Sequence, residues 1–341
     1  MINLKANAKI KDSRAVDLLN TYFGINKDNN KYIDKDINKN TNKYIDWEMF
    51  TLSRSNIEIN EVRKKIISII KNLDAYFFER YELIEAILIS IISKQHMILI
   101  GEPGLAKTAI LKALAKHVNG IKLFDYQMTP YTEINDLLSK NPLNKGRGID
   151  KCEIVLIDEF FKGKPSTLNS LLSIMNERIL YNPKPVNIPL ISLFATSNEK
   201  PDKSVSSNLL PLYDRFLLRK EVLPITDKDN FKNLLKLNEE YSFNNINLEL
   251  DDLKKIIMIS KEINITEDIY NLIFSIREEL KNRQVIVSDR RWRDTVKIIK
   301  AKALLENRNF VSINDIKSME SSMWTYYSDI RTVKNIINKF T

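Results

Sequence analysis

The eight residues GEPGLAKT, at positions 101–108, come close to a phosphate-binding loop, which places two glycines, a lysine and a serine or threonine in a fixed order. In such a loop the backbone N–H groups surround phosphate oxygens. The lysine reaches the β- and γ-phosphates, and the hydroxyl side chain binds Mg²⁺. Lys107 and Thr108 hold these two positions here. The candidate phosphate-binding residues are Gly101, Glu102, Pro103, Gly104, Leu105, Ala106, Lys107 and Thr108.

Ala106 stands where the usual pattern has its second glycine. Alanine adds only one methyl group, and it adopts the right-handed helical conformation without strain. We therefore expect the loop to remain functional, provided that this position does not need a positive φ. The alternative interpretation is a turn before a surface helix, with Lys107 in solvent.

Two adjacent carboxylates follow a second apolar segment. The sequence IVLIDE, at positions 154–159, ends in Asp158 and Glu159, and parallel sheets bind ligands at the carboxyl ends of their strands. Asp158 is a candidate Mg²⁺ ligand, and Glu159 is a candidate general base that polarises the attacking water. A strand that ends in solvated acids is common by itself. Here it follows a phosphate-binding loop by about fifty residues, which favours the functional interpretation.

An asparagine and two arginines complete the candidate site. Asn198, near the end of LFATSNE, is placed to orient the water and to contact the γ-phosphate. Arg215 in YDRF and Arg290 in SDRRW are candidates for stabilising the charge of the transition state. The alternative for Asn198 is an asparagine that starts a turn, and the alternative for the two arginines is a solvated surface residue or a weak ion pair. Neighbouring arginines compete for the last two roles: Arg219 with Arg215, and Arg291 and Arg293 with Arg290.

Apolar segments that alternate with helical ones must position these residues. The strand-like segments are HMILIG, IKLFDYQM, CEIVLID, PLISLFATS and RFLLRKEV, which begin at residues 96, 121, 152, 189 and 215. Continuous apolar strands separated by helices predict a parallel sheet that is covered on both faces. The expected fold class is therefore α/β.

The sequence predicts three regions. Residues 1–58 are polar and low in complexity, which predicts a partly disordered extension. Residues 59–225 carry the α/β domain, which opens with an amphipathic helix from Asn60. Residues 226–341 predict an all-helical domain without strands. Two capping boxes are expected in this last region, formed by Thr226 with Asp229 and by Ser312 with Asp315.

Composition limits the class of protein. The chain has 341 residues, a net charge of +9, two histidines and one cysteine, Cys152. A single cysteine excludes a disulfide framework, and this set makes a zinc site unfavourable. The positive charge permits anionic partners, nucleic acid included, but it is spread along the chain without a clear basic patch. The N-terminus lacks a signal-peptide core, and the most apolar run is about half a membrane span, so we expect a cytoplasmic protein.

The order of these segments resembles the AAA+ ATPases of the MoxR group, and most closely their RavA branch. The similarity covers roughly residues 60–341 and rests on FFERYELIEAI, GEPGLAKT, DEFFKGKPSTLNSLLSIMNER, TSNE, LYDRF, TDKDNF and VSDRRWRDTVKIIKAKALL. That branch also carries alanine before the loop lysine, which implies that Ala106 is a family feature. The resemblance implies a P-loop AAA+ parallel sheet sandwiched by helices, followed by an all-helical lid.

The resemblance also implies cofactors, partners and roles. ATP and Mg²⁺ are the implied cofactors, and ATP hydrolysis is the implied activity. A homo-hexameric ring, a protein substrate and a von Willebrand A-domain partner are implied as well. Segments 129–140 and 179–190 look like the family's helix-2 insertion and its hairpin before sensor 1. The implied residue roles are Walker A for Lys107 and Thr108, Walker B for Asp158 and Glu159, sensor 1 for Asn198, sensor 2 for Arg290, and an arginine finger acting on a neighbouring subunit for Arg215.

Two other functions stay open at this point. A nucleic-acid motor of the MCM-like clade shares the insertions and is mildly favoured by the basic charge, but no basic or zinc-bearing binding module is evident. A nucleotide-gated scaffold would bind ATP with little turnover, and Glu159 argues against it because a scaffold can dispense with a base. RavA-like chains usually continue beyond the lid into a partner-binding domain. Because this sequence ends at Thr341, the partner roles of that domain are not transferred to it.

Overall fold

The computed structural model describes residues 41–181, 184–199, 210–237 and 247–341, with side chains from residue 59 onward. Most of the predicted extension, residues 1–40, therefore lies outside the described residues. A compact unit runs from Ile57 to Thr341 and holds every element that the candidate site uses. Among the helices of the described ranges, none is long and apolar enough to span a membrane.

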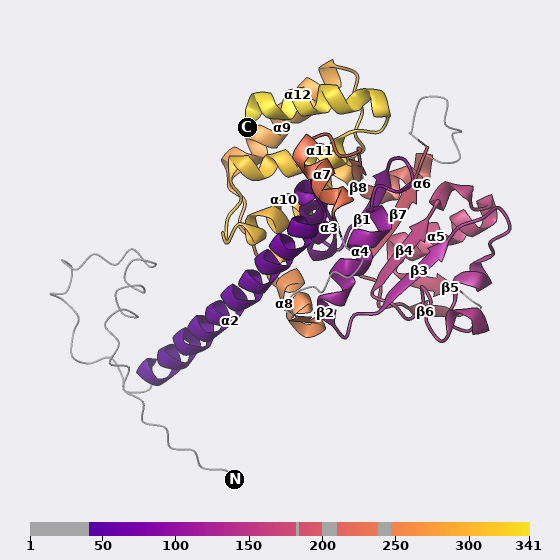
Figure 1. Ribbon diagram of the computed structural model, residues 1–341. Coiled ribbons are helices and arrows are strands. Elements are labelled where there is room, and N and C mark those ends of the chain that lie inside the picture. Colours follow the sequence, from indigo (N-terminus) through magenta and orange to yellow (C-terminus); the bar gives the residue numbers. More distant parts are fainter. Residues whose placement is uncertain (1–40, 182–183, 200–209, 238–246) are drawn as a thin grey trace, which may run out of the picture. The chain divides into compact units, whose positions relative to one another are not determined.

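A five-stranded parallel sheet forms the centre of this unit (Figure 1). All five strands coincide with the apolar segments of the sequence, which confirms the predicted α/β class. The two central strands have every residue buried, because a parallel sheet of this kind is covered on both faces. In the order in which they lie side by side, the strands are β3 (Leu123–Gln127), β4 (Ile154–Asp158), β7 (Ser192–Ser197), β1 (His96–Ile100) and β8 (Phe216–Glu221).

The register of the strands separates two edges of the sheet. At one edge Ile100 of β1 pairs with Ser197 of β7, and β4 ends beside them. At the opposite edge Phe216, the first residue of β8, pairs with His96, the first residue of β1. We call these the carboxyl edge and the amino edge. The phosphate-binding loop, Glu159 and Asn198 follow strands at the carboxyl edge, whereas Arg215 precedes a strand at the amino edge.

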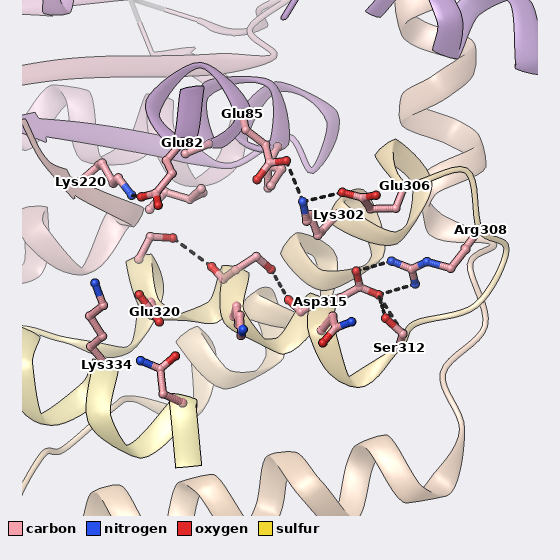
Figure 2. A pocket seen from close by; sticks show the side chains of 18 residues that line it. Glu82, Glu85, Lys220, Lys302, Glu306, Arg308, Ser312, Asp315, Glu320 and Lys334 are labelled. Atoms are coloured by element: carbon pink, nitrogen blue, oxygen red, sulfur yellow. Dashed lines mark hydrogen bonds and ion pairs between the residues drawn. The ribbon is translucent and has the colours of Figure 1, made fainter. Parts of the chain in front are cut away.

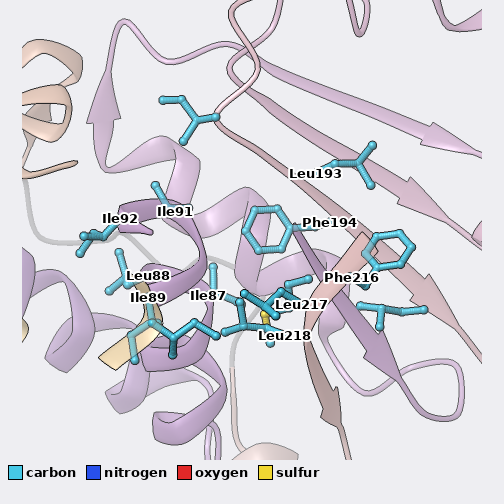
Figure 3. Packing of buried hydrophobic residues seen from close by; sticks show 14 of the residues in the cluster. Ile87, Leu88, Ile89, Ile91, Ile92, Leu193, Phe194, Phe216, Leu217 and Leu218 are labelled. Atoms are coloured by element: carbon cyan, nitrogen blue, oxygen red, sulfur yellow. The ribbon is translucent and has the colours of Figure 1, made fainter. Parts of the chain in front are cut away.

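Helix α3 (Tyr81–Ile92) supplies much of the core on one face of the sheet. Figure 3 shows its residues Ile87 and Leu88 beside Phe194 of β7 and Leu217 of β8, in one buried cluster. Burying each such side chain contributes about 1.5–3 kcal/mol. The other helices of the α/β part are α2 (Thr41–Tyr76), α4 (Lys107–Lys116), α5 (Pro165–Glu177) and α6 (Leu210–Arg215), with 3₁₀ turns η1 (Ile134–Leu137), η2 (Pro142–Asn144) and η3 (Phe160–Lys162).

Helix α2 begins at Thr41, earlier than the start at Asn60 that the apolar pattern predicted. The amphipathic stripe is where the sequence placed it, with Val62, Ile66 and Leu73 buried. Extending an existing helix fixes one residue for each hydrogen bond gained, so polar residues join it without an apolar stripe of their own. Residues 41–58 of the predicted extension are therefore helical.

Two short pairings complete the α/β part. β5 (Ile179–Tyr181) and β6 (Pro185–Asn187) form the antiparallel hairpin expected within residues 179–190. β2 (Val118–Asn119) pairs in parallel with β9 (Leu248–Glu249). The prediction that strands stop before residue 226 is therefore wrong. A two-residue strand held by backbone hydrogen bonds, such as Leu248 N–H to His117 O at 2.8 Å, needs no apolar run that a pattern could detect.

The C-terminal part is helical, as predicted. Its first element, α7 (Lys228–Leu235), is capped by Asp227, which accepts hydrogen bonds from the N–H groups of Asp229 and Asn230. The predicted box of Thr226 with Asp229 is wrong, because the Thr226 hydroxyl donates to Glu79 instead. The remaining elements are α8 (Leu250–Lys261), α9 (Glu267–Asn282), α10 (Asp289–Leu305), η4 (Ile313–Met319), α11 (Glu320–Met323), η5 (Tyr327–Asp329) and α12 (Ile330–Phe340).

The second predicted capping box is confirmed. Asp315 accepts from the backbone N–H of Ser312, and the Ser312 side chain accepts from the backbone N–H of Asp315, at the start of η4. Asp315 is fully buried and also accepts two hydrogen bonds from the Arg308 guanidinium, at 2.5 and 2.6 Å. The cap is thus tied to the loop that follows α10.

Glu79 joins the turn before α3 to the start of α7, and it makes stability depend on pH. Its carboxylate accepts hydrogen bonds from the N–H groups of Thr226 and Asp227, which lower the pKa of Glu79 to about 2. A folded pKa below the unfolded value stabilises the protein above the unfolded value of 4.5, and this stabilisation is lost as pH falls toward 2. Glu79→Gln should therefore lower the melting temperature at pH 7, with a difference that shrinks from pH 5 to pH 2.

The matched control is Glu262→Gln, because Glu262 is an exposed carboxylate at the end of α8. Its melting temperature should follow that of the parent at every pH. A Glu79→Gln difference that stayed constant across this range would contradict the assigned role of the carboxylate.

Candidate functional site

The phosphate-binding loop follows β1 at the carboxyl edge and needs glycine at its first position. Gly101 has a φ of +156°, and a Cβ there would lie 2.4 Å from the Val222 carbonyl oxygen. Its N–H donates to Ser197 O at 3.0 Å, which ties the loop to the end of β7. Gly104 has a φ of +81°, which favours glycine for its backbone conformation alone. Glycine is therefore needed at Gly101 because of a close backbone contact, and it is favoured at Gly104 because of the positive φ.

Ala106 adopts the left-handed conformation, with φ +62° and ψ +15°, just before α4 begins. The expectation of a right-handed alanine is wrong, because the position directly before α4 has a positive φ. A left-handed L-residue costs roughly 1–2 kcal/mol compared with glycine. The loop thus keeps the backbone shape that the usual glycine provides, and it carries strain at this residue.

Lys107 is buried, with 7% of its surface exposed. Its ammonium donates to the carbonyl oxygens of Gly101 and Glu102, at 2.5 and 2.8 Å. Burial lowers the pKa of Lys107, and the negative charges of Asp158 and Glu102 oppose that effect. The alternative of a solvated surface lysine is excluded, since the side chain folds back into the loop.

The Asp158 carboxylate, at the end of β4, contacts helix α4 and strand β7 at the carboxyl edge. Thr108 donates its hydroxyl to the Asp158 oxygens at 3.0 and 3.1 Å, and Thr196 of β7 donates to one of them at 2.9 Å. Thr196 also accepts a hydrogen bond from the Glu159 N–H at 3.1 Å. Carboxylate and hydroxyl oxygens are ligands that suit Mg²⁺, so Thr108 and Asp158 fit the metal role predicted for them.

Sequence reasoning missed Thr196, which is 4% exposed. The available signal was its position two residues before Asn198 in an apolar strand, where a hydroxyl has to find a hydrogen-bond partner. Thr196 positions both acids of the site, since it contacts the carboxylate of one and the backbone of the next.

Glu159 also has left-handed backbone, with φ +54° and ψ +43°. Its carboxylate forms an ion pair with Lys162, and 22% of its side chain is exposed. Asn198 is exposed just beyond β7, at the same edge. The carboxyl edge therefore brings the loop, both acids and Asn198 together, and Lys162 is a second contact that the sequence did not reveal.

Arg215 and Arg290 lie together at the amino edge, away from the loop. Arg290 donates to the Asn176 side chain at 2.6 Å, near the end of α5. Burial lowers the pKa of Arg215, and the nearby charge of Arg290 lowers it further. The Arg215 Nε is buried without a hydrogen-bond partner among the described residues. A cavity of about 490 Å³ opens beside Arg215 and is lined by Asp214, Ser288 and Tyr326, among others.

The length of the strands decides which site these arginines can serve. β1 has five residues, so at about 3.3 Å per residue the two edges lie roughly 16 Å apart. The resemblance implied the sensor 2 role for Arg290. Its place beside Asn176 puts it on the far side of the sheet from Lys107.

The competing arginines are placed differently. Arg219 is fully buried and donates to Phe216 O at 3.1 Å and to Tyr213 O at 2.7 Å. Arg291 is 2% exposed and donates to Trp324 O at 2.7 Å. Arg293 is exposed and contacts Asp294 at 3.4 Å. Arg219 and Arg291 are therefore buried and hydrogen-bonded inside the protein, whereas Arg293 is exposed to solvent.

A charged cavity of about 600 Å³ lies between α3, β8 and the lid helices (Figure 2). Ion pairs cross it from core to lid, including Lys302 to Glu85 at 2.7 Å. Lys220 of β8 pairs with Glu82 at the same distance. None of the candidate site residues lines this cavity. Its charged side chains therefore connect the α/β part with the C-terminal helices, and they do not belong to the phosphate site.

Two family comparisons match most of the described chain. Residues 64–258 match the family described as the MoxR domain in the MoxR-vWA-beta-propeller ternary systems. Residues 268–337 match the AAA lid domain family. Neither description names the RavA branch, so that part of the sequence prediction stays a prediction.

Individual relatives agree with these matches. Two uncharacterized proteins of Methanocaldococcus jannaschii, MJ0079 and MJ0812, are each 34% identical, over 83% and 74% of this chain and 76% and 70% of their own lengths. Chaperone MoxR1 of Mycobacterium tuberculosis is 30% identical over 28% of this chain and 27% of its own. A crystal structure of a candidate ATPase from Cytophaga hutchinsonii superposes with a TM-score of 0.69 over 85% of this chain and 98% of that one. At 21% identity, that structure supports the fold alone.

The left-handed backbone of Ala106 leads to a paired prediction. Ala106→Gly relieves the backbone strain, but it also increases the conformational entropy of the unfolded chain. The free energy of unfolding should therefore stay level or rise by up to about 1 kcal/mol. Ala109→Gly, three residues along in α4, should lower it by about 0.5–1 kcal/mol. Denaturant unfolding without nucleotide measures both. If both variants lose stability equally, the left-handed assignment of Ala106 is wrong.

Proposed function

The chain belongs to the MoxR group of AAA+ ATPases, and from this membership we propose that it hydrolyses ATP with Mg²⁺ to remodel partner proteins. The observation that carries the proposal is the gathering of Lys107, Thr108, Asp158 and Glu159 at the carboxyl edge. The family description supports a partner with a von Willebrand A domain. The name of the related mycobacterial protein supports a chaperone-like role.

The residues of the carboxyl edge divide the chemistry among them. The loop N–H groups and Lys107 bind the phosphates, and the lysine exchanges its carbonyl partners for phosphate oxygens. Thr108 and Asp158 would hold Mg²⁺, which supplies charge neutralisation at the phosphates. Glu159 accepts the proton of the attacking water, while Asn198 orients that water. Thr196 fixes the positions of the two acids relative to each other. Lys162 pairs with the Glu159 carboxylate until the attacking water replaces Lys162 as its partner.

Arg215 and Arg290 act on the nucleotide of a neighbouring subunit in this proposal. They lie at the amino edge, roughly 16 Å from their own loop, which is beyond the reach of an arginine side chain. A site completed by the next copy makes hydrolysis depend on assembly, and repetition of the same contact closes a ring. A homo-hexamer is the ring that we propose.

The rival functions have less support. Both matched families describe MoxR and AAA lid domains, which favours protein remodelling over a motor of the MCM-like clade. A scaffold with little turnover would not need the buried Lys107 and the positioned Glu159 together. Turnover measurements separate this last alternative from the proposal.

Lys107→Ala and Glu159→Gln should fail in different ways. Loss of Lys107 removes a phosphate contact, so ATP affinity and turnover should both fall. Loss of the Glu159 carboxylate removes the base, so turnover should fall by about 10²–10⁴-fold while ATP still binds. Nucleotide titration and phosphate release measure the two effects. Parent-like hydrolysis by Glu159→Gln would overturn the assignment of the base.

Mixing variants tests the action between subunits. Arg215→Ala keeps an intact loop but lacks the arginine, and Lys107→Ala keeps the arginine but lacks a working loop. Each alone should lose roughly 10³-fold or more in turnover, because such an arginine stabilises transition-state charge. Mixed under subunit exchange, the two should partly restore activity, since some interfaces then pair a good loop with a good arginine.

Arg290→Ala should behave like Arg215→Ala in this assay. Arg293→Ala is the matched control, because Arg293 is exposed three residues away and should keep full turnover. If no mixture recovers despite demonstrated exchange, the two arginines act within their own subunit or in folding, and the ring proposal fails.

A further inference from the structure

A second cavity, of about 280 Å³, lies near the amino edge and is strongly basic. It is bounded by the ends of α3 and α5 and by helices α8 and α10. Five of its ten lining residues are cations, and none of those ten is an acid. The cationic residues are Lys94, Arg178, Lys261, Lys297 and Lys300.

Three of these cations have protein partners. Arg178 donates to Lys94 O at 2.6 Å and to Leu190 O at 3.1 Å, and its own helix ends there. Lys300 donates to Lys261 O at 2.8 Å. Lys297 contacts Asp294 at 2.8 Å. Backbone carbonyl groups, together with one carboxylate, therefore explain why these three side chains are held at the cavity.

The other two cations are not explained in this way. Within the part of the chain that the structure describes, no hydrogen bond or ion pair involves the ammonium group of Lys94 or of Lys261. Lys94 is half-buried and has left-handed backbone, with a φ of +54°. Burial lowers the pKa of Lys94, and the positive charges of Arg178 and Lys261 lower it further. The site thus concentrates like charges where a bound anion would relieve their repulsion.

We propose that this basic cavity binds a small tetrahedral oxyanion of the phosphate type, with Lys94 and Lys261 as its principal ligands. Lysine binds phosphate as a mobile point charge, so two ammonium groups that line one cavity, from the turn after α3 and from the end of α8, suit such an ion. The volume lies just below the range of about 300–1,000 Å³ that accommodates drug-sized ligands. A single phosphate group therefore fits better than a whole nucleotide.

The location gives the bound anion a structural effect. Lys94 and Arg178 belong to the α/β part, whereas Lys261 and Lys297 belong to helices that follow it. An anion among them connects the two by charge, as the ion pairs of the larger cavity do elsewhere. The cavity is separate from the phosphate-binding loop, because no residue of that loop lines it.

Calorimetric titration with inorganic phosphate tests the proposal. The full chain is first saturated with Mg²⁺ and a non-hydrolysable ATP analogue, so that phosphate cannot enter the loop. Saturable binding is expected, and it should stabilise the protein against heat as the phosphate concentration rises. Potassium chloride at the same ionic strength should give no such heat, which separates binding from screening.

Variants then locate the site. Lys94→Gln should weaken phosphate binding by about tenfold or more, and Lys261→Glu should abolish it, because an exposed position receives a carboxylate that repels the anion. Lys281→Gln is the matched control, at an exposed lysine of α9 that does not line the cavity. All three should keep parent affinity for the ATP analogue. Absence of saturable binding in the parent, or equal affinity in Lys261→Glu and Lys281→Gln, would overturn the proposal.

Discussion

The hydrogen bonds that Thr108 and Thr196 donate to the Asp158 carboxylate are the constraint on which the nucleotide site depends. Asp158 ends β4, Thr196 belongs to β7, and Thr108 lies in the first turn of α4, directly after the loop that follows β1. A carboxylate held by two hydroxyl donors has little freedom, so the positions of the loop and of the following Glu159 are set by the sheet. Loss of either donor would leave a partly buried charge under-satisfied.

The sheet also separates the functions of its two edges. Parallel strands of five or six residues place the candidate groups for nucleotide binding and hydrolysis on one side and the two arginines on the other. No side chain spans that distance, so completion of the site requires a second copy in our proposal. The same geometry would make assembly a switch for activity without a moving part inside the subunit.

Two of the non-glycine residues with left-handed backbone lie at the carboxyl edge, whereas others, such as Lys94 and Arg178, lie elsewhere. Ala106 and Glu159 both have positive φ, and they stand next to Lys107 and Asp158, the candidate phosphate and metal ligands. Left-handed non-glycine residues persist only where the surrounding structure over-determines them. At Glu159 the ion pair to Lys162 and the hydrogen bond from its N–H to Thr196 provide that support.

The sequence by itself determined the five strands, the loop, the two acids and the family, because apolar runs and motif spacing are local signals. The conformation of Ala106 escaped it, since a left-handed turn is imposed by how the chain enters α4 and not by the residue type. The strand β9 and the cap of α7 escaped it as well, because β2 and Glu79 are distant in sequence from their partners. Only the tertiary structure decided that Arg219 and Arg291 are buried while Arg215 and Arg290 share the amino edge. The residue type is the same at all four positions, and only packing determines the surroundings of each side chain.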